Sequence, residues 1–431
     1  MYTLGCKLNF AETSSFGRNF TERGYKVVDF NEQSDVVVVN TCSVTENADR
    51  DCRKIVRKAL RRSPDAYVIV VGCYAQLRPE EIASIDGVDL VLGADEKFRM
   101  FEFAGDFSKE RIPKIHVGDI EEATNYSPAF SDDSTGRTRA FLKVQDGCDY
   151  NCSFCTIPLA RGASRSAPVD ATIENARTLI AEGYKEIVLS GVNVGDYGTK
   201  IGTSLHELLL GLLALEGDFR LRISSIEPNL LTDEIIDLAR GDSRLCRHFH
   251  IPLQSGSPEV LRNMRRRYTR DLYRERIERI AETMPDCAIG IDVIVGFPGE
   301  TDRHFEETYQ FLNELPFTYL HVFSYSERPD THALSFGETV DPQVRSTRSK
   351  MLRTLSEKKR RAFYERHIGD IRPMLLEGNY DGDKQIGFTD NYIKVGIPKR
   401  DFDENTLLRV QLSEIGTGFV LGDPVSDPVL A

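Results

Sequence analysis

The sequence predicts a three-part α/β protein, in which an open parallel sheet is followed by a partial (β/α)6 TIM-like barrel and a small all-β barrel. Three observations lead to this prediction. Strand-like and helix-like segments alternate over the first ~120 residues, which is typical of an open parallel sheet. A second alternation begins near residue 138, and beyond residue 370 short strand-like runs are separated by Gly and Asp turns. A length of 431 residues suits two or three domains of this kind.

The expected domain boundaries follow these changes of pattern. The open sheet takes residues 1–121, and the polar, turn-rich residues 122–136 form a linker. The partial barrel takes residues 137–367, and the small β-barrel takes residues 368–431.

In the first part, VVVVN (36–40) and YVIVV (67–71) are β-branched runs of the kind that forms buried strands. The segment RDCRKIVRKALRR between them has a helical pattern. TLGC follows Met1 and Tyr2 directly, so we expect either a short first strand or a start that lies further upstream.

In the second part, six strand-like segments alternate with helical ones in units of roughly 25–45 residues. They are AFLKVQDG, EIVLSGVN, FRLRISSIEP, RHFHIPLQSG, AIGIDVIVGFPGE and YLHVFSYSE. Six units make three-quarters of a TIM-like barrel, whose active site lies at the carboxyl ends of the strands. A long basic helix follows, and four short segments then predict an OB-like barrel: RPMLLEG, GFTDNYIKV, TLLRVQL and GFVLGDPV.

Composition bounds the class of protein. Hydrophobic residues make up 40% and charged residues 28% of the chain, no apolar run approaches the ~18 residues of a membrane span, and MYTLGCKLNF lacks the layout of a secretory signal. We therefore expect a cytoplasmic protein, in which clustered cysteines more often bind metal than form disulfides. The net charge of −12 argues against wholesale coating by nucleic acid but not against a local basic face.

Three of the nine cysteines lie in the segment GCDYNCSFC: Cys148, Cys152 and Cys155. Their spacing is C-x3-C-x2-C, and they directly follow the first strand of the expected barrel. Three thiolates in a short loop can hold three irons of a 4Fe–4S cluster, which leaves the fourth iron open for chemistry. The alternative interpretation is a zinc knuckle or a chance spacing.

Cys6, Cys42 and Cys73 share another pattern, because each follows an apolar strand-like run. If these strands are parallel, the three thiols lie along one carboxyl edge, where open α/β sheets bind ligands. This predicts a second cluster with three protein ligands. The alternative is three buried hydrophobic cysteines, a common environment for this residue. The remaining cysteines are interpreted as structural: Cys52, Cys246 and Cys287.

The C-x3-C-x2-C spacing, with Phe154 before the last cysteine, resembles the radical S-adenosylmethionine (SAM) superfamily. There, the open iron chelates the amino and carboxylate groups of SAM, and reductive cleavage gives a 5′-deoxyadenosyl radical. By this resemblance, residues that follow the other barrel strands would bind SAM, although each alone also suits an ordinary βα turn. These residues are Gly191, Asn193, Ser225, Glu227, Gln254 and Gly296.

The whole chain resembles the methylthiotransferases of that superfamily. The resemblance lies in TLGCKLNFAET, NTCSVTENAD, GCYAQLRPEEI, CDYNCSFCTIPLARGASRS, HIPLQSGS and DVIVGFPGET. The family has branches that act on isopentenyladenosine in tRNA, on threonylcarbamoyladenosine in tRNA, or on an aspartate of a ribosomal protein. GCKLN, with Lys7 after Cys6, looks like the threonylcarbamoyladenosine branch, as do SSIEP and GFTDNYIKV. The resemblance implies that the terminal β-barrel is a TRAM domain, which binds RNA or substrate.

The resemblance also implies a reaction: methylthiolation of C2 of N6-threonylcarbamoyladenosine at tRNA position 37, in the anticodon loop. It implies two 4Fe–4S clusters and two SAM molecules, one as methyl donor and one as radical source. We expect a flavodoxin or ferredoxin as the reductant, and we expect the protein to be a monomer. An iron–sulfur RNA-binding regulator without turnover is the alternative from another class.

Arg161, in PLARG, is the candidate catalytic-site contact for the substrate carboxylate, because Arg suits a planar bidentate contact. The alternative is a salt bridge that supports the cysteine loop. RKIVRKALRR (53–62) and RNMRRRYTR (262–270) are candidates for holding the tRNA backbone, against the alternative of solvated helix faces. In the acidic β-barrel, RNA contacts would come from local groups, which are Tyr392, Lys394, Lys399 and Arg400.

Overall fold

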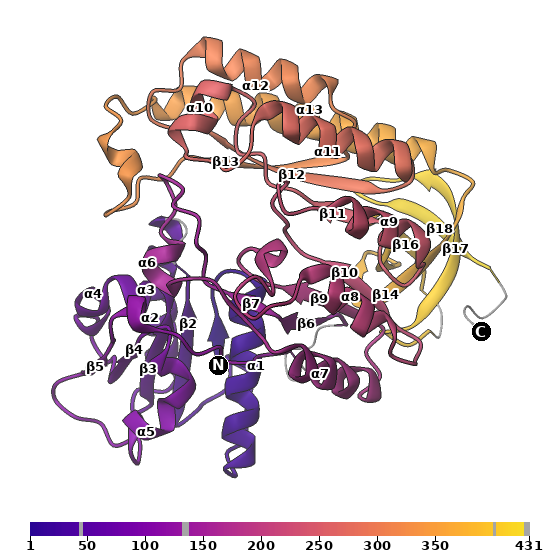
Figure 1. Ribbon diagram of the computed structural model, residues 1–431. Helices are drawn as coiled ribbons and strands as arrows, with labels where there is room; N and C mark the ends of the chain where they lie inside the picture. Colours follow the sequence, from indigo (N-terminus) through magenta and orange to yellow (C-terminus); the bar gives the residue numbers. More distant parts are fainter. Residues whose placement is uncertain (43–45, 132–137, 400–401, 426–431) are drawn as a thin grey trace. The chain divides into compact units, whose positions relative to one another are not determined.

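The computed structural model describes residues 1–42, 46–131, 138–399 and 402–425, with only the backbone of 46–49. The chain forms two compact units, shown with their elements in Figure 1 and described separately below. The N-terminal unit comprises Met1–Thr135, Phe141–Ala167 and Ser326–Leu334. The C-terminal unit comprises Gly136–Ala140, Pro168–Tyr325 and Ser335–Ala431. Residues 141–167, which hold the C-x3-C-x2-C segment, thus group with the N-terminal sheet, while the predicted domain boundaries stay predictions.

The N-terminal unit contains a five-stranded sheet in the order β1-β2-β3-β4-β5. All four pairings are parallel, as the sequence predicts. The strands are β1 (Tyr2–Thr3), β2 (Val36–Thr41), β3 (Tyr67–Gly72), β4 (Leu90–Leu92) and β5 (Lys114–His116). The helices are α1 (Lys7–Glu22), α2 (Glu46–Arg62), α3 (Cys73–Leu77), α4 (Pro79–Ala83), α5 (Met100–Ala104) and α6 (Ile157–Arg161), with 3-10 turns η1 (Glu96–Arg99) and η2 (Ile120–Glu122). A two-stranded ribbon of β7 (Gln145–Asp146) and β8 (Arg165–Ser166) precedes and follows the cysteine loop.

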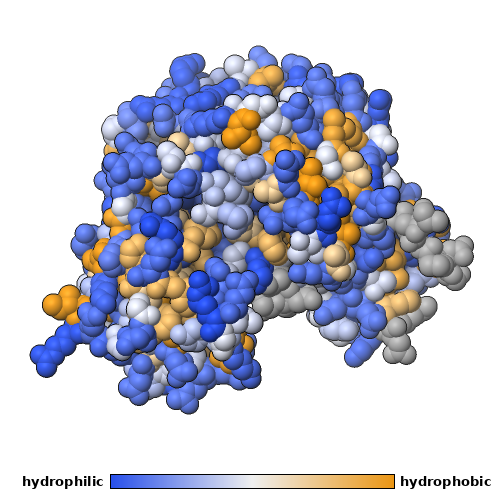
Figure 2. Space-filling model, turned by 60° about the horizontal axis from the view of Figure 1, so that its bottom comes forward, coloured by the Kyte–Doolittle hydropathy of each residue, from blue (hydrophilic) through white to orange (hydrophobic). Residues whose placement is uncertain are grey.

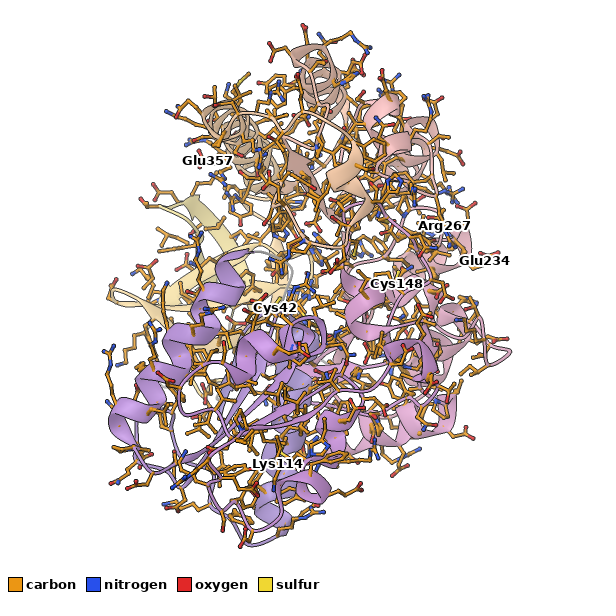
Figure 3. The ribbon with its side chains drawn as sticks, turned by 90° about the vertical axis from the view of Figure 1, so that its left-hand side faces the viewer. Cys42, Lys114, Cys148, Glu234, Arg267 and Glu357 are labelled. Atoms are coloured by element: carbon orange, nitrogen blue, oxygen red, sulfur yellow. The ribbon has the colours of Figure 1, made fainter. Side chains whose placement is uncertain are left out.

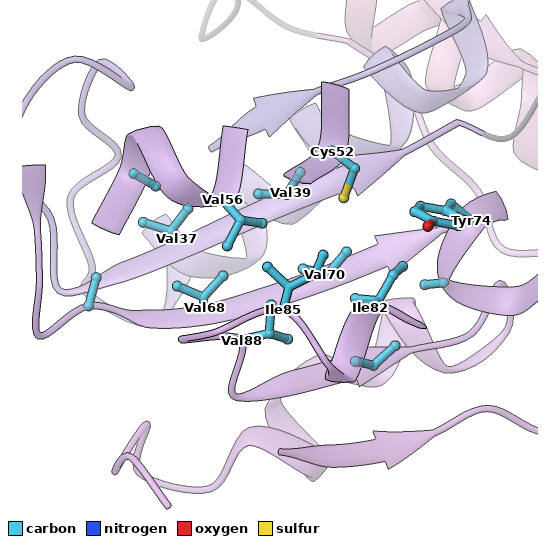
Figure 4. Close-up of a cluster of buried hydrophobic side chains, with 14 residues drawn as sticks. Val37, Val39, Cys52, Val56, Val68, Val70, Tyr74, Ile82, Ile85 and Val88 are labelled. Atoms are coloured by element: carbon cyan, nitrogen blue, oxygen red, sulfur yellow. The ribbon is translucent and has the colours of Figure 1, made fainter. Parts of the chain in front are cut away.

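Both faces of this sheet are buried, because successive valines of β2 and β3 point to opposite sides. Val37 and Val39 join a core with residues of α2, which lies over one face in Figure 4. Val38 packs on the other side with aromatic residues of α1, including Phe16. The valine runs that predicted buried strands therefore supply two cores at once.

The C-terminal unit contains parallel strands that alternate with helices. β9 (Glu186–Ser190) pairs with β10 (Arg220–Ile223), and β11 (His248–His250), β12 (Ala288–Val295) and β13 (Tyr319–Ser324) form a second parallel set. A bridge between Ser225 and His250 links the two sets. The helices are α7 (Val169–Ala181), α8 (Leu205–Leu213), α9 (Asp233–Gly241), α10 (Pro258–Asn263), α11 (Arg270–Thr283), α12 (Asp302–Glu314) and α13 (Pro342–Arg366), with a 3-10 turn η4 (Val194–Asp196). A further 3-10 turn, η5 (His332–Ser335), belongs to the N-terminal unit except for its last residue. With β6 (Ala140–Lys143), which spans the boundary between the units, each of the six predicted segments contains a strand.

The chain ends in a small closed β-barrel with the strand order β14-β15-β16-β18-β17, as the sequence predicts. Its strands are β14 (Ile371–Asp381), β15 (Lys384–Thr389), β16 (Lys394–Pro398), β17 (Leu407–Ile415) and β18 (Val420–Pro424). Arg220 and Arg222 on β10 both pair with the buried Glu186 of β9, with 2.6 Å and 2.7 Å from their Nε atoms to its carboxylate. They also donate to backbone carbonyls of this β-barrel, at Phe388 and Asp390. One buried ion cluster therefore fastens the β-barrel to the parallel strands.

No helix in the described part of the chain is long and apolar enough to cross a membrane. On the face drawn in Figure 2, hydrophilic residues (blue) predominate, with smaller groups of hydrophobic residues (orange) among them. The cysteines interpreted as structural, Cys52, Cys246 and Cys287, are all buried. Burial raises the pKa of the Cys246 thiol to about 11, against the opposing effect of Arg222, so this thiol stays protonated near neutral pH.

Candidate functional site

Cys6, Cys42 and Cys73 follow three neighbouring parallel strands, β1, β2 and β3. Cys42 and Cys73 come directly after their strands, and Cys6 precedes the first turn of α1. Gly5 has a φ of +103°, and a Cβ on it would lie 2.5 Å from the Cβ of Cys42. The loop that carries Cys6 therefore passes against Cys42, at the carboxyl edge of the sheet, where the sequence predicts these thiols to meet (Figure 3 labels Cys42).

Asn9, which the sequence analysis did not select, holds these strand ends together. Its side-chain amide donates to the carbonyl of Leu4 at 2.7 Å and to that of Thr41 at 2.9 Å. Its Oδ1 lies 3.8 Å from the sulfur of Cys6, which donates to it. Desolvation raises the pKa of the Cys6 thiol, although part of this residue is open to solvent, and Arg161 opposes the rise.

The second cysteine set lies in the loop after β7. The backbone N–H of Tyr150 donates to the sulfur of Cys148, and that of Ile157 donates to the sulfur of Cys155, each at 3.4 Å. Cys152 is buried, and the other two cysteines are half-buried. Amide donors that point at sulfur stabilise thiolates, so this loop suits the ligation of an iron–sulfur cluster.

Arg161, on α6, connects the two cysteine sets within the N-terminal unit. Its side chain is only 1% exposed, and its Nε donates to the sulfur of Cys73 at 3.3 Å. Its Nη1 donates to both Glu12 and Asp146 at 2.9 Å, and its Nη2 donates to Asn9 at 2.7 Å. This geometry favours the loop-supporting alternative for Arg161, and its contact with a substrate carboxylate stays a prediction.

The charges around Arg161 form a buried network. Glu12 also accepts from Lys97 at 2.7 Å and from Lys143 at 3.2 Å. Although burial favours the neutral acid, Arg161 and the two lysines hold the pKa of the Glu12 carboxyl well below its usual range. Glu12, on α1, is therefore ionised, and it balances cations from α6, η1 and β6 beside the cysteines.

In the C-terminal unit, the predicted SAM-binding residues follow the carboxyl ends of the parallel strands. Gly191 and Asn193 follow β9, and Ser225 and Glu227 follow β10. Ser225 Oγ lies 2.7 Å from Nδ1 of His250. Their common position at the strand ends matches the prediction, but their role in SAM binding stays a prediction.

Gln254 and Gly296, after β11 and β12, have unusual backbone conformations. Gln254 adopts a φ of 68°, which is uncommon for a residue with a Cβ. Gly296 has a φ of +77°, and a Cβ on it would lie 2.4 Å from Cγ of Arg345, so its close contact is with that side chain. A positive φ strains Gln254 but not Gly296, because glycine has no Cβ, and the role of both residues in SAM binding stays a prediction.

Glu227 and Arg266 form an ion pair. Glu227 is a predicted SAM-binding residue, whereas Arg266 belongs to a stretch predicted to hold the tRNA backbone. Arg266, in the basic stretch 262–270, donates to Glu227 at 2.6 Å, and its side chain is only 4% exposed. Burial raises the pKa of the Glu227 carboxyl, Arg266 opposes this, and the nearby Asp292 carboxylate adds to it. Arg266 is therefore not available to a tRNA phosphate.

The other predicted RNA contacts differ in how exposed they are. Arg57 and Arg61 are exposed and line a surface hollow of about 410 Å³ beside α2. Tyr392 instead stacks on His248, with ring centroids 4.3 Å apart. Lys399 is exposed and lies over the ring of Tyr380. Arg400 lies outside the described residues.

Comparisons with known proteins agree with this arrangement. Residues 142–312 match the Radical SAM superfamily, and residues 1–93 match a family described as Uncharacterized protein family UPF0004. The chain is similar in fold to TsrM, a radical S-adenosylmethionine methyltransferase from Kitasatospora setae, whose structure holds cobalamin and a [4Fe-4S] cluster. The TM-score is 0.57 at 15% identity, and the match covers 77% of this chain and 76% of that one.

Curated relatives match nearly the whole chain. The "Threonylcarbamoyladenosine tRNA methylthiotransferase MtaB" of Bacillus subtilis is 39% identical over 425 residues, covering 96% of this chain and 93% of the relative. The protein of the same name from Aquifex aeolicus is 38% identical, covering 91% of this chain and 95% of the relative. The cofactors are S-adenosylmethionine and 4Fe–4S clusters. The chain belongs to the radical SAM tRNA methylthiotransferases of the MtaB type.

Proposed function

We propose that the protein methylthiolates C2 of N6-threonylcarbamoyladenosine at tRNA position 37, giving 2-methylthio-N6-threonylcarbamoyladenosine. The observation that carries this proposal is the match over almost the whole chain to two relatives that are named for threonylcarbamoyladenosine. The motif GCKLN, with Lys7 after Cys6, supports the same branch.

Two 4Fe–4S clusters would be held by the two cysteine sets. Cys148, Cys152 and Cys155 would hold the cluster that binds SAM, and Cys6, Cys42 and Cys73 would hold the second cluster. When bound, the clusters and two SAM molecules supply the electron, the radical, the sulfur and the methyl group that an unactivated aromatic C–H bond requires. The amide donors to Cys148 and Cys155, and the Arg161 donor to Cys73, are the features of this chain that fit thiolate ligands.

The chain's own residues would then bind SAM and the tRNA and hold them in position. Residues after the barrel strands would hold SAM: Gly191, Asn193, Ser225, Glu227, Gln254 and Gly296. The exposed basic face of α2, with Arg57 and Arg61, would hold the tRNA backbone near the anticodon loop. A flavodoxin or ferredoxin as reductant, a monomeric state and a cytoplasmic location are further predictions.

A second candidate substrate is isopentenyladenosine. A "tRNA-2-methylthio-N(6)-dimethylallyladenosine synthase" from Syntrophotalea carbinolica is 33% identical and covers 88% of this chain. Its lower identity places this candidate behind threonylcarbamoyladenosine.

Nucleoside mass spectrometry tests the proposal directly. The protein is reconstituted anaerobically with iron and sulfide, then given SAM, reductant and tRNA that carries either modified adenosine. Methylthiolated threonylcarbamoyladenosine alone supports the proposal, and methylthiolated isopentenyladenosine alone replaces it with the second candidate. SAM cleavage without either product points to a protein substrate, and no SAM cleavage at all points to a regulator.

A further inference from the structure

Asp292 joins two histidines on neighbouring strands of the C-terminal unit. It lies in the middle of β12, and its Oδ1 is 2.9 Å from Nε2 of His250 and 3.1 Å from Nδ1 of His321. Asp292 and His321 face each other directly across the β12–β13 pair, so their side chains project from the same face of the sheet. None of these three residues was selected from the sequence, because the contact depends on strand register.

The protonation state of Asp292 determines which ring nitrogen of each histidine donates a hydrogen bond to it. Although burial favours the neutral acid, His250 and His321 hold the pKa of the Asp292 carboxyl well below its usual range. An ionised carboxylate only accepts hydrogen bonds, so His250 donates through Nε2 and His321 donates through Nδ1. The nitrogen that remains on His321 is Nε2.

The two histidines differ in what else they can reach. The second nitrogen of His250 lies 2.7 Å from Ser225 Oγ, and its side chain is 12% exposed. The side chain of His321 is 52% exposed, and no hydrogen bond to its Nε2 occurs among the residues that the structure describes. His250 and Asp292 thus form a fixed support, and His321 presents one nitrogen outward.

An exposed aromatic ring adjoins this nitrogen. Phe323 is two residues further along β13, on the same face, and it is 48% exposed. Its ring centroid is 6.5 Å from that of His321, with an angle of 75° between the planes. A flat apolar ring next to an oriented polar nitrogen suits a ligand that combines a base with a charged substituent.

We propose that Nε2 of His321 binds the free carboxylate on the N6 substituent of the substrate adenosine, with Asp292 and His250 as positioning residues. This inference rests on the proposed function, because it assigns a contact to that substrate. With Nδ1 of His321 donating to Asp292, Nε2 is the ring nitrogen that is left for a ligand, and in the doubly protonated ring its N–H donates to a second carboxylate. An isopentenyl group offers no such acceptor, so this contact separates the two candidate substrates.

The alternative occupant is a single metal ion. One ligand atom from each of His250, Asp292 and His321 lies within 4.8 Å of the other two, which is close enough for one divalent ion. Both histidines already bond to one oxygen of this carboxylate, Oδ1, so the cluster is held together without an ion. Metal binding is therefore an outcome of the test and not the proposal.

The test compares two substrates that differ by one charge. Reconstituted enzyme is given anticodon stem-loops whose adenosine carries the threonylcarbamoyl group either as the free acid or as its methyl ester. We expect the wild type to prefer the acid, in kcat/KM, by roughly ten- to hundredfold, the range of a hydrogen bond to a charged group. His321→Gln should lose most of this preference through a higher KM for the acid, with little change in the KM for the ester.

Two further variants sharpen the test. Asp292→Asn should also weaken the preference, since it removes the charge that orients His321, and His206→Gln on α8 should leave the preference unchanged. If His321→Gln keeps the wild-type preference, or slows both substrates equally, the inference is wrong. Zinc bound stoichiometrically by the wild type but not by His321→Gln would also overturn it. A wild type that modifies neither stem-loop but modifies isopentenyladenosine would overturn the proposed function instead.

Discussion

Arg161 is the side chain that joins the two cysteine sets, because its Nε donates to Cys73 while α6 follows the C-x3-C-x2-C loop directly. The sequence singled out this residue for its charge and its position after the loop. Its partners Asn9 and Glu12 come from the far N-terminus, so their contact could not be read from spacing. If Cys73 ligates the second cluster as proposed, Arg161 is a positioning residue beside that ligand.

Replacing Arg161 by Lys should change the reduction potential of the second cluster more than that of the first. Lys keeps the positive charge beside Glu12 but cannot keep all the directed donors, so we expect the bond to the Cys73 sulfur to be lost. Because hydrogen bonds to sulfur stabilise the reduced state, the reduction potential of the cluster held by Cys73 should fall. A redox titration followed by electron paramagnetic resonance measures this.

The matched control for Arg161→Lys is Arg177→Lys on the surface of α7, which should change neither potential. Cleavage of SAM by the first cluster should continue in Arg161→Lys. Equal potentials in wild type and Arg161→Lys would show that the Cys73 contact has no influence on the cluster.

Gly5 illustrates crowding at the strand ends. In Gly5→Ala, the new Cβ would meet Cys42 at 2.5 Å, so Cys42 must move and the second cluster should be lost, leaving about half of the iron. Gly24→Ala is the control, because Gly24 also has a positive φ, +87°, but has nothing within 4 Å of the new Cβ. Iron analysis after reconstitution decides: full iron content in Gly5→Ala would contradict the prediction, and an equal loss of iron in both variants would attribute it to backbone strain instead of crowding at Cys42.

At the scale of elements, Glu186 on β9 holds β10 and the terminal β-barrel through Arg220 and Arg222. Although burial favours the neutral acid, these arginines hold the pKa of the Glu186 carboxyl well below its usual range. A depressed folded-state pKa stabilises the fold above the unfolded value of about 4.3, and this stability is lost as the pH falls toward the folded value.

Glu186→Gln should therefore lower the free energy of unfolding by about 3–5 kcal/mol at neutral pH, since two buried cations lose their partner. The difference from wild type should shrink below a pH of about 4. Urea unfolding at neutral and acidic pH measures both, with the exposed Glu174→Gln as control. A difference that stays constant with pH would mean that Glu186 does not titrate in this way.

The helix α2 carries one of the two basic faces proposed to hold tRNA. Arg57 and Arg61 are exposed, with no ion pair among the described residues. In the other stretch, the Arg266 side chain is paired and buried, while Arg262, Arg265 and Arg267 are exposed. In Arg57→Ser/Arg61→Ser, the slope of log K against log salt for tRNA binding should become shallower by about one to two units. An unchanged slope would identify this face as merely solvated, and Arg177→Ser serves as the control.

At the scale of the whole molecule, substitutions in the two cysteine sets should affect different steps of the reaction. Cys148→Ala should abolish 5′-deoxyadenosine formation, because it would remove a proposed ligand of the cluster that binds SAM. Cys42→Ala should keep that activity and lose the methylthiolated product, with about half of the iron retained. Product analysis by mass spectrometry separates these outcomes, and Cys246→Ala is the control. Loss of SAM cleavage in Cys42→Ala would mean that the sets do not hold separate clusters.

The sequence by itself determined that the valine runs of β2 and β3 are buried strands of a parallel sheet and that Cys6, Cys42 and Cys73 follow strand-like runs, because hydrophobic periodicity and cysteine spacing are local properties. Only the tertiary structure grouped residues 141–167 with the N-terminal sheet and brought Asn9 and Glu12 to Arg161. It alone paired Asp292 with His321, since register between strands sets which side chains face each other. It also turned Arg266 inward, because a buried carboxylate, Glu227, needs a partner that no local pattern reveals.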